Sequence, residues 1–238
     1  IGKLTKALLP LLKNNLDETL SPELIQKLNL PTSEQSYFDI HLPKDAKALI
    51  RAQKRLKFEE FFFLQLHLLK LKLTRRKKFK GYAFENLGDG FNDFYNKHLP
   101  FQLTGAQKRV LKEIRHDVKN PQQMNRLLQG DVGSGKTLVA LLSMLMAVDN
   151  KYQACLMAPT EILARQHFET ISVYLQKQDI KLAILTGSTK AKARKVLHEQ
   201  LENGEIDILI GTHALLEDKV KFKQLALVVI DEQHRFGV

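Results

Sequence analysis

The first hundred residues of the chain follow a mostly helical pattern of apolar positions. Prolines divide residues 1–40, which predicts short helices there, and Ser21 is expected to cap the helix that opens at Pro22. Residues 44–78 contain neither glycine nor proline. Apolar side chains recur there near one face at helical spacing, namely Leu49, Ala52, Leu56, Phe63, Leu66 and Leu73. This pattern predicts one long amphipathic helix and leaves open a break near its end.

The pattern changes at Phe101, where short apolar runs begin to alternate with helical stretches. The apolar runs predict strands over Arg126–Gln129, Ala154–Ala158, Leu182–Leu185, Ile206–Ile210 and Leu225–Ile230. The stretches between them predict helices over Lys136–Val148, Glu161–Leu175 and Lys190–Asn203, and another helix, Gly105–Val118, precedes the first of these runs. Such alternation, with nearly continuous apolar strands, is typical of a parallel sheet covered by helices on both faces.

The expected fold class is therefore α/β, with a parallel sheet flanked by helices and a mainly α-helical segment before it. We expect two parts, residues 1–100 and residues 101–238. The glycine-containing stretch 79–100 is expected to connect them.

Charge is concentrated in one segment of the chain. The net charge is +11, and residues 41–80 contain 13 Lys or Arg against 3 Asp or Glu. A basic segment favours polyanionic partners such as nucleic acid, but a solvated helix face has the same composition, and for residues 70–80 both interpretations stay open. The run Phe61–Phe63 favours packing over base stacking. Cys155, the single cysteine, lies in an apolar run and is expected to be a buried structural thiol. No apolar run reaches the roughly 20 residues that span a bilayer, so no membrane association is expected.

A complete phosphate-binding motif lies between a predicted strand and a predicted helix. The residues are Gly130, Asp131, Val132, Gly133, Ser134, Gly135, Lys136 and Thr137. Glycines let the backbone N–H groups face phosphate oxygens, and the helix that follows adds its positive end. Lys136 is placed to reach the β- and γ-phosphates, and Thr137 to offer its hydroxyl to Mg²⁺. The motif predicts binding of ATP or a similar nucleotide.

Two carboxylates follow the last predicted strand. Asp231 is the natural partner of Mg²⁺, and Glu232 is placed to polarise an attacking water. A kinase would need no water-activating glutamate at this position, so the pair favours hydrolysis. Lys136, Asp231 and Glu232 are therefore the predicted catalytic residues, with Thr137 and Asp231 as metal ligands.

Several longer strings, in this order and spacing, resemble the RecG family of superfamily 2 DNA helicases. They are Met124–Thr137, Met157–His167, Gly211–Leu216 and Asp231–Val238. The resemblance covers about residues 101–238 and implies a RecA-like P-loop NTPase domain. Mfd, a transcription-repair DNA translocase, is similar here, but its family usually has Glu where Gln233 stands. A nucleotide-gated DNA-binding switch is a further alternative, and it would lack Glu232.

The resemblance implies roles for residues outside the phosphate loop. Phe101 would stack on adenine and Gln107 would hydrogen-bond it. The alternative is that Thr104 simply caps the helix that follows it, and the two roles are compatible. Pro159, Thr160, Thr186, Gly187, Gly211 and Thr212 would contact a DNA backbone, with helix capping as the alternative for Thr160. Gln233 and His234 would relay between the ATP and DNA sites, unless His234 is a plain surface residue.

The resemblance also implies partners and missing parts. Residues 52–60 are similar to a signature of the linker that joins the wedge domain of RecG to its motor. An OB-fold wedge would precede Ile1, and a second RecA-like domain with an arginine finger would follow Val238. We therefore expect a monomer that acts on branched and double-stranded DNA in the bacterial cytoplasm, at the nucleoid. Without the second domain, the isolated chain should hydrolyse ATP hardly at all.

Overall fold

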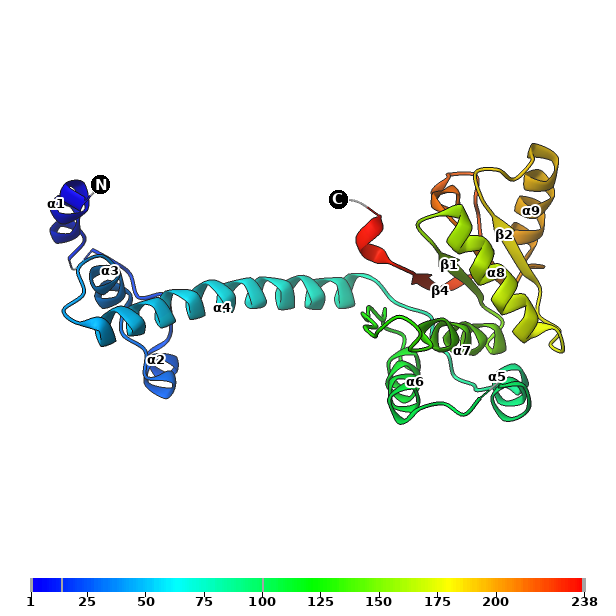
Figure 1. Cartoon of the computed structure of the whole chain (residues 1–238), viewed down its shortest axis with the longest axis horizontal. Helices are drawn as coiled ribbons and strands as arrows, with labels where there is room; N and C mark the ends of the chain where they lie inside the picture. The colour runs from blue at the N-terminus through cyan, green and yellow to red at the C-terminus, as the bar shows by residue number, and fades with distance from the viewer. Residues whose placement is uncertain (1, 14, 100, 237–238) are drawn as a thin grey trace. The chain divides into compact units, whose positions relative to one another are not determined.

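The computed structural model describes residues 2–13, 15–99 and 101–236. The chain divides into two compact units, Ile1–Lys78 and Phe79–Val238 (Figure 1). The second unit begins at Phe79, earlier than the change of pattern at Phe101 suggested. No helix in the described residues is long and apolar enough to cross a membrane.

The first unit is helical, as expected. It contains α1 (Gly2–Leu12), α2 (Pro22–Leu28), α3 (Ser33–His41) and α4 (Ala46–Lys78). The predicted cap is confirmed, because the Ser21 side chain accepts a hydrogen bond from the backbone N–H of Leu24. Helix α4 runs through all 33 of its residues, so the break that the sequence left open does not occur.

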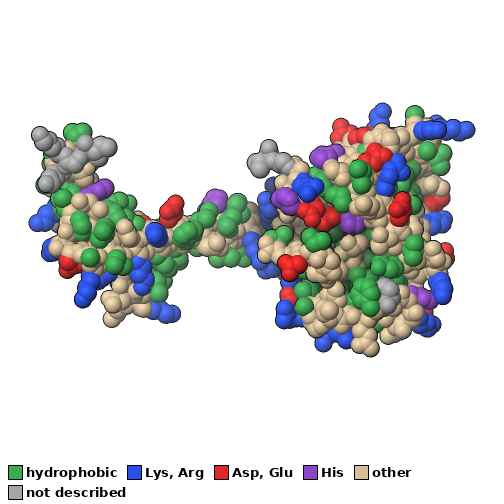
Figure 2. Space-filling view, in the orientation of Figure 1, with side chains coloured by type: hydrophobic (Ala, Val, Ile, Leu, Met, Phe, Trp, Pro, Cys, Tyr) green, Lys and Arg blue, Asp and Glu red, His purple; other side chains and the backbone are tan. Residues whose placement is uncertain are grey.

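The expected apolar face of α4 is only partly buried. Ala52 is buried, whereas Phe63, Leu66 and Leu73 are exposed, and Figure 2 shows apolar side chains along the surface of this helix. The predicted packing of the phenylalanine run holds for Phe62, which stacks on Phe58 with ring centroids 5.7 Å apart. Within the first unit, the predicted apolar face is therefore buried in the first half of α4 and exposed in the second half.

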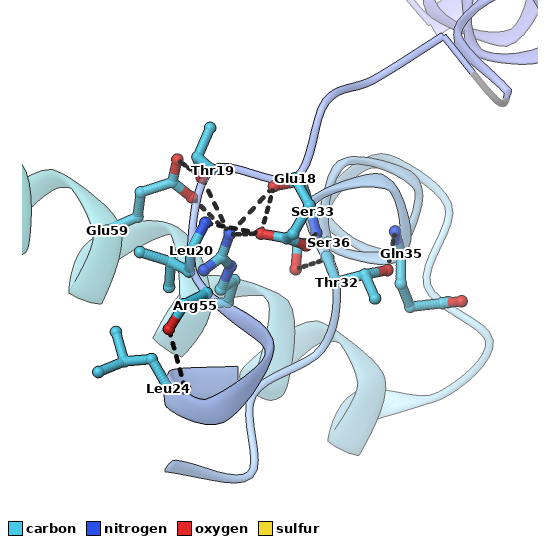
Figure 3. A network of polar contacts seen from close by, with 11 residues as sticks. Glu18, Thr19, Leu20, Leu24, Thr32, Ser33, Gln35, Ser36, Arg55 and Glu59 are labelled. Atoms are coloured by element: carbon cyan, nitrogen blue, oxygen red, sulfur yellow. Dashed lines mark hydrogen bonds and ion pairs between the residues drawn. The ribbon is translucent and has the colours of Figure 1, made fainter. Parts of the chain in front are cut away.

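A buried arginine holds the first unit together (Figure 3). The Arg55 side chain is 0% exposed, and its Nη2 lies 2.6 Å from Glu18 Oε1 and 3.1 Å from Glu59 Oε2. The same atom lies 3.0 and 3.2 Å from the hydroxyl oxygens of Ser33 and Thr19, so its two N–H groups are shared among these acceptors. Burial alone would raise the pKa of Glu18, but hydrogen bonds from the Ser33 and Leu20 backbone and the charge of Arg55 outweigh it and lower that pKa. Arg55 lies within residues 52–60, which resemble the linker signature, and its role in this unit is structural.

The second unit contains a parallel sheet, as predicted. The strands β1 (Gln153–Met157), β2 (Leu182–Leu185), β3 (Ile208–Gly211) and β4 (Leu225–Ile230) are arranged in the order β2-β3-β1-β4. Neighbouring strands pair in parallel throughout. The strand ends agree with the sequence prediction to within two residues.

Helices cover both faces of this sheet (Figure 1). Helices α7 (Lys136–Asp149) and α8 (Glu161–Leu175) cover one face, and α9 (Ala191–Asn203) covers the other. Helix α6 (Gly105–Val118) packs on α7. Alternate residues of β1 enter different cores: Ala154 and Leu156 pack with residues of α7 and α8, while Cys155 and Met157 pack with Leu201 of α9. Burial raises the pKa of the Cys155 thiol to about 12, so this thiol is structural, as expected. Short helical turns complete the unit, namely η2 (His213–Leu216) and η3 (Gln233–Arg235).

The predicted strand Arg126–Gln129 does not form. Residues 123–130 make no strand pairing, and Leu127 is 70% exposed. The Arg126 guanidinium instead forms ion pairs of 2.6 Å with both Glu113 and Asp117 of α6. These ion pairs hold the segment against α6, and the strand prediction is wrong here.

Residues 79–99 are part of the second unit. They contain α5 (Asp89–Asp93) and a π-helical turn, η1 (Phe94–His98), and Phe84, Phe91 and Phe94 enter the core beside α7. The Asp149 carboxylate at the end of α7 accepts hydrogen bonds from the backbone N–H groups of Gly88, Gly90 and Phe91. A Cβ at Gly90 would lie 2.6 Å from an Asp149 oxygen, so glycine permits this close approach. This stretch is therefore anchored to α7 of the second unit.

Candidate nucleotide and DNA site

The phosphate loop turns sharply into α7. Gly133 and Gly135 have φ angles of 80° and 78°, a left-handed conformation that glycine adopts without strain. Helix α7 begins at Lys136, as predicted, and its buried apolar side chains fix the helix against the sheet. Because the first N–H groups of a helix have no partner within the helix, this arrangement suits a phosphate group.

Lys136 lies across the loop that it follows. Its ammonium donates hydrogen bonds to the backbone carbonyls of Gly130 and Asp131, at 2.8 and 2.9 Å. The charge is thereby held within the loop. A phosphate oxygen in the loop would offer the ammonium an anionic acceptor in place of two neutral carbonyls, and such charge-assisted bonds are stronger.

Gln107 ties α6 to the phosphate loop. Its amide oxygen accepts from the Thr104 backbone N–H at 2.9 Å, while the Thr104 hydroxyl accepts from the Gln107 N–H, so the capping interpretation of Thr104 is confirmed. The amide nitrogen of Gln107 donates to the carbonyl of Ser134 in the loop at 2.8 Å. Gln107 is buried, and each of its amide atoms already has one partner.

Phe101 lies beside a surface hollow near α6. Its side chain is 52% exposed. The hollow has a volume of about 300 Å³ and is lined by Tyr95, Asn96, Leu99, Phe101, Gln102, Leu103 and Lys108. An aromatic ring next to a partly apolar hollow suits a planar ligand such as a nucleobase.

Asp231 and Glu232 lie where β4 ends. The Asp231 backbone N–H donates to the Met157 carbonyl at 2.9 Å, which continues the pairing with β1. Glu232 has φ 49° and ψ 46°, a left-handed conformation that is uncommon for a residue other than glycine. Strained backbone of this kind clusters at functional sites, which agrees with the predicted catalytic role of Glu232.

His167 contacts the predicted metal ligand and was given no role by the sequence analysis. Its Nε2 lies 2.8 Å from Oδ2 of Asp231. His167 is in the second turn of α8, within the string Met157–His167 that carries the family resemblance. The only available signal was its membership of that string, because the contact spans 64 positions and depends on β4 lying beside β1.

The oxygen ligands that the chain offers fit Mg²⁺ when phosphate is also bound. Asp231 offers a carboxylate, and Thr137 offers a hydroxyl in the first turn of α7. The described residues contain no group of three or more His, Cys, Asp or Glu that could hold a metal ion by themselves. Mg²⁺ is usually held by one or two carboxylates together with substrate phosphates and water, so this sparse oxygen set is suitable.

The predicted DNA contacts separate into exposed and buried positions. Thr160 and Gly187 are exposed, and Pro159 and Thr212 are half-buried. The Thr160 hydroxyl caps α8 by accepting from the Leu163 N–H, so the capping interpretation holds, and its exposure leaves the DNA contact as a prediction.

Two of the predicted contacts are not at the surface. The Thr186 side chain is 1% exposed, its hydroxyl lies 3.1 Å from that of Ser188, and its N–H donates to Thr189. Gly211 is buried where a Cβ would lie 2.3 Å from the Leu185 carbonyl oxygen. Both residues shape the loops from within, so the prediction that they contact DNA needs correction.

A polar network joins α8 to the loop after β2. Ser188 donates to the Glu161 carboxylate, and Arg165 donates to both of them. These bonds from Ser188 and Arg165 lower the pKa of Glu161. The two loops that resemble DNA-contacting motifs are therefore connected.

Gln233 and His234 lie in η3 and are exposed, with His234 Nε2 3.5 Å from the Glu232 carboxylate. The surface interpretation of His234 thus agrees with the structure. Its predicted relay role remains a prediction, supported by this one contact with Glu232.

A phosphate loop at the start of α7 and an Asp-Glu pair at the end of a parallel strand define a nucleotide-binding motor fold. Residues 104–238 match the DEAD/DEAH box helicase family, and the chain belongs to this family.

Within that family the likeness is to RecG. The chain is 46% identical to the ATP-dependent DNA helicase RecG of Bacillus subtilis over 225 residues, which is 94% of this chain and 33% of that protein. It is 43% identical to RecG of Thermotoga maritima over 230 residues, 97% of this chain and 29% of that protein. A solved structure of RecG bound to a three-way DNA junction matches with a TM-score of 0.85 and 42% identity, over 99% of this chain and 32% of that one. The resemblance to RecG and the RecA-like fold are confirmed.

The chain spans about a third of the length of these relatives. The match also extends through the helical first unit, because the alignments cover nearly the whole chain. The sequence resemblance had been specific only from about residue 101.

Proposed function

We propose that this chain provides the linker region and first motor domain of a RecG-type ATP-dependent DNA helicase that acts on branched DNA. Replication forks and Holliday junctions are the proposed substrates, and recombination and repair are the proposed processes. The observation that carries the proposal is the pairing of a complete phosphate loop with the Asp231-Glu232 strand end in one fold. The likeness to a RecG structure bound to a three-way DNA junction supports the choice of branched DNA.

Each residue has a defined part in the proposed nucleotide site. The loop from Gly130 to Gly135 would surround the phosphates, and Lys136 would leave its carbonyl partners for a phosphate oxygen. Thr137 and Asp231 would hold Mg²⁺, which would supply charge neutralisation at the phosphates when bound. Glu232 would orient and polarise the water. These steps amount to positioning and electrostatic stabilisation, which dominate phosphoryl-transfer catalysis.

The adenine would lie against Phe101, in the hollow beside it. Gln107 would use its remaining amide hydrogen and lone pair for the base, while it keeps its bonds to Thr104 and Ser134. Its contact with the Ser134 carbonyl supports a second role, in which it links the base to the phosphate loop.

A second RecA-like domain of the same longer protein would complete the site by supplying an arginine finger. An arginine finger contributes roughly 10³–10⁵ in rate in other NTPases. We therefore propose that the isolated chain is a folded monomer with ATPase activity near background, and that the longer protein works at the bacterial nucleoid.

The proposal is tested by unwinding assays on the full-length protein. Wild type should unwind a fork in the presence of Mg²⁺ and ATP but leave a blunt linear duplex of equal length intact. Lys136→Ala should keep the fold, measured by far-UV circular dichroism, and lose both ATP hydrolysis and unwinding. Equal unwinding of both substrates by wild type, or normal turnover by Lys136→Ala, would refute the proposal.

A further inference from the structure

The contact between His167 and Asp231 joins a helix to a predicted metal ligand. The distance from His167 Nε2 to Asp231 Oδ2 is 2.8 Å, and the two side chains are 14% and 26% exposed. A hydrogen bond shielded to this degree keeps more of its strength than one on the open surface. The contact is therefore able to fix a side-chain orientation.

The remaining polar atoms of Asp231 are also held. Its Oδ1 accepts from the Glu232 N–H at 3.0 Å, and its own N–H donates to the Met157 carbonyl. Since an ionised carboxylate only accepts, a neutral His167 must carry its proton on Nε2. One lone pair on each carboxylate oxygen stays available for a further partner. The carboxylate plane is thus set by two donors, the backbone N–H of the next residue, Glu232, and the His167 ring of α8.

The position of His167 is fixed independently of Asp231. Helix α8 buries Ala164, Ile171 and Leu175 in the core beside the sheet. His167 lies between the first two of these along the helix, so its ring is carried by a packed element. A rigid element is a better support for an orienting group than a loop.

We propose that His167 is a positioning residue that orients the Asp231 carboxylate for the Mg²⁺ of bound Mg·ATP. This inference rests on the proposed function, because it takes Asp231 as the metal ligand. His167 acts through Asp231 and touches neither nucleotide nor metal. Groups that orient a metal ligand typically contribute 10- to 100-fold to metal affinity, and an effect of that size is expected here.

The test compares His167→Leu with His167→Gln in the full-length protein. Leucine removes the donor, whereas the glutamine amide can place an N–H near the position of Nε2. Affinity for a fluorescent, non-hydrolysable ATP analogue is measured with excess Mg²⁺ and again with EDTA. The readout is the ratio of the two affinities, which isolates the contribution of the metal from that of the fold.

His167→Leu should reduce this ratio at least tenfold while it leaves the affinity in EDTA unchanged, and His167→Gln should restore it to within about threefold of wild type. The matched control is His116→Leu, the same substitution at an exposed histidine of α6, which should leave the ratio unchanged. An unchanged ratio in His167→Leu would overturn the positioning role, whether both affinities stay at the wild-type value or both fall by the same factor. A wild-type protein whose affinity does not depend on Mg²⁺ would instead refute the proposed function.

Discussion

The side-chain amide of Gln107 donates to the backbone carbonyl of Ser134 at 2.8 Å, so the residue expected to recognise adenine also supports the phosphate loop. Gly135 has φ 78°, which favours glycine, and a Cβ there would also lie 2.4 Å from the same amide nitrogen. The proposed base recognition and the support of the phosphate loop would thereby share one side chain.

Gln107→Ala separates these two roles. Loss of the bond to Ser134 loosens the loop, so affinity should fall for both ATP and GTP. Loss of base recognition should add a further decrease for ATP alone. A hydrogen bond is worth about 1 kcal/mol, so we expect a decrease of about fivefold for GTP and a larger one for ATP. Unaffected GTP binding would argue against loop support, and equal losses would argue against adenine recognition.

Arg55→Met should destabilise the first unit. The substitution leaves the partly buried carboxylates of Glu18 and Glu59 without their cation, which costs about 3 kcal/mol. Hydrogen exchange of backbone amides in α3 and α4, measured by mass spectrometry, should show the loss of protection. Arg51→Met, one turn earlier on α4 and exposed, is the control and should change protection by less than about 0.5 kcal/mol. Equal protection in the two variants would contradict the structural role of Arg55.

The same network predicts a response to acid. The pKa of Glu18 is lower in the folded chain than its ordinary value of 4.5, so folding favours the ionised form. Its contribution should be fully present above about pH 4.5 and should be lost as the pH falls through the lowered folded pKa. Protection of the first unit should therefore decrease below pH 4.5 less steeply in Glu18→Gln than in wild type. An identical decrease in both would show that Glu18 does not contribute.

The sequence predicts most closely those elements whose signals are local. The start of α7 follows from the glycines of the phosphate loop, and the bounds of α6, α8, β2 and β4 agree with the prediction. The strand predicted at Arg126–Gln129 does not form, and Arg126 is instead paired with Glu113 and Asp117 of α6, partners that the local pattern of apolar residues does not contain. His167 was missed because its contact with Asp231 depends on strand order, which periodicity does not contain. The burial of Arg55 was likewise not predicted, because its partner Glu18 is distant in the sequence and no local sequence pattern marks it.

Mutation distinguishes the two interpretations of the basic end of α4, a contact with DNA and a solvated helix face. Arg75, Arg76, Lys77 and Lys78 occupy its last turn, where successive side chains point about 100° apart. No more than about two of them can therefore face one DNA backbone. Changing all four to Gln should weaken binding to a DNA junction and make the plot of log affinity against log salt shallower by about two units.

The matched control changes four exposed basic residues near the start of α4 to Gln, namely Lys44, Lys47, Arg51 and Lys54. In the variant at the end of α4, binding should weaken equally for different DNA sequences, because contacts to the DNA backbone contain no base information. An unchanged salt dependence in that variant would establish the solvated-face interpretation, and an equal change in the control would show a nonspecific charge effect.

The most direct measurement of the central claim compares Glu232→Gln with wild type in the full-length protein, for ATP hydrolysis and fork unwinding. The substitution keeps the Asp231 carboxylate for Mg²⁺ and removes the base that polarises water. We predict that Glu232→Gln binds ATP and fork DNA within about threefold of wild type, while hydrolysis falls by 10² or more and unwinding is lost with it. Hydrolysis at the wild-type rate, or loss of ATP binding, would contradict the assignment of this strand end as the hydrolytic centre of a DNA helicase.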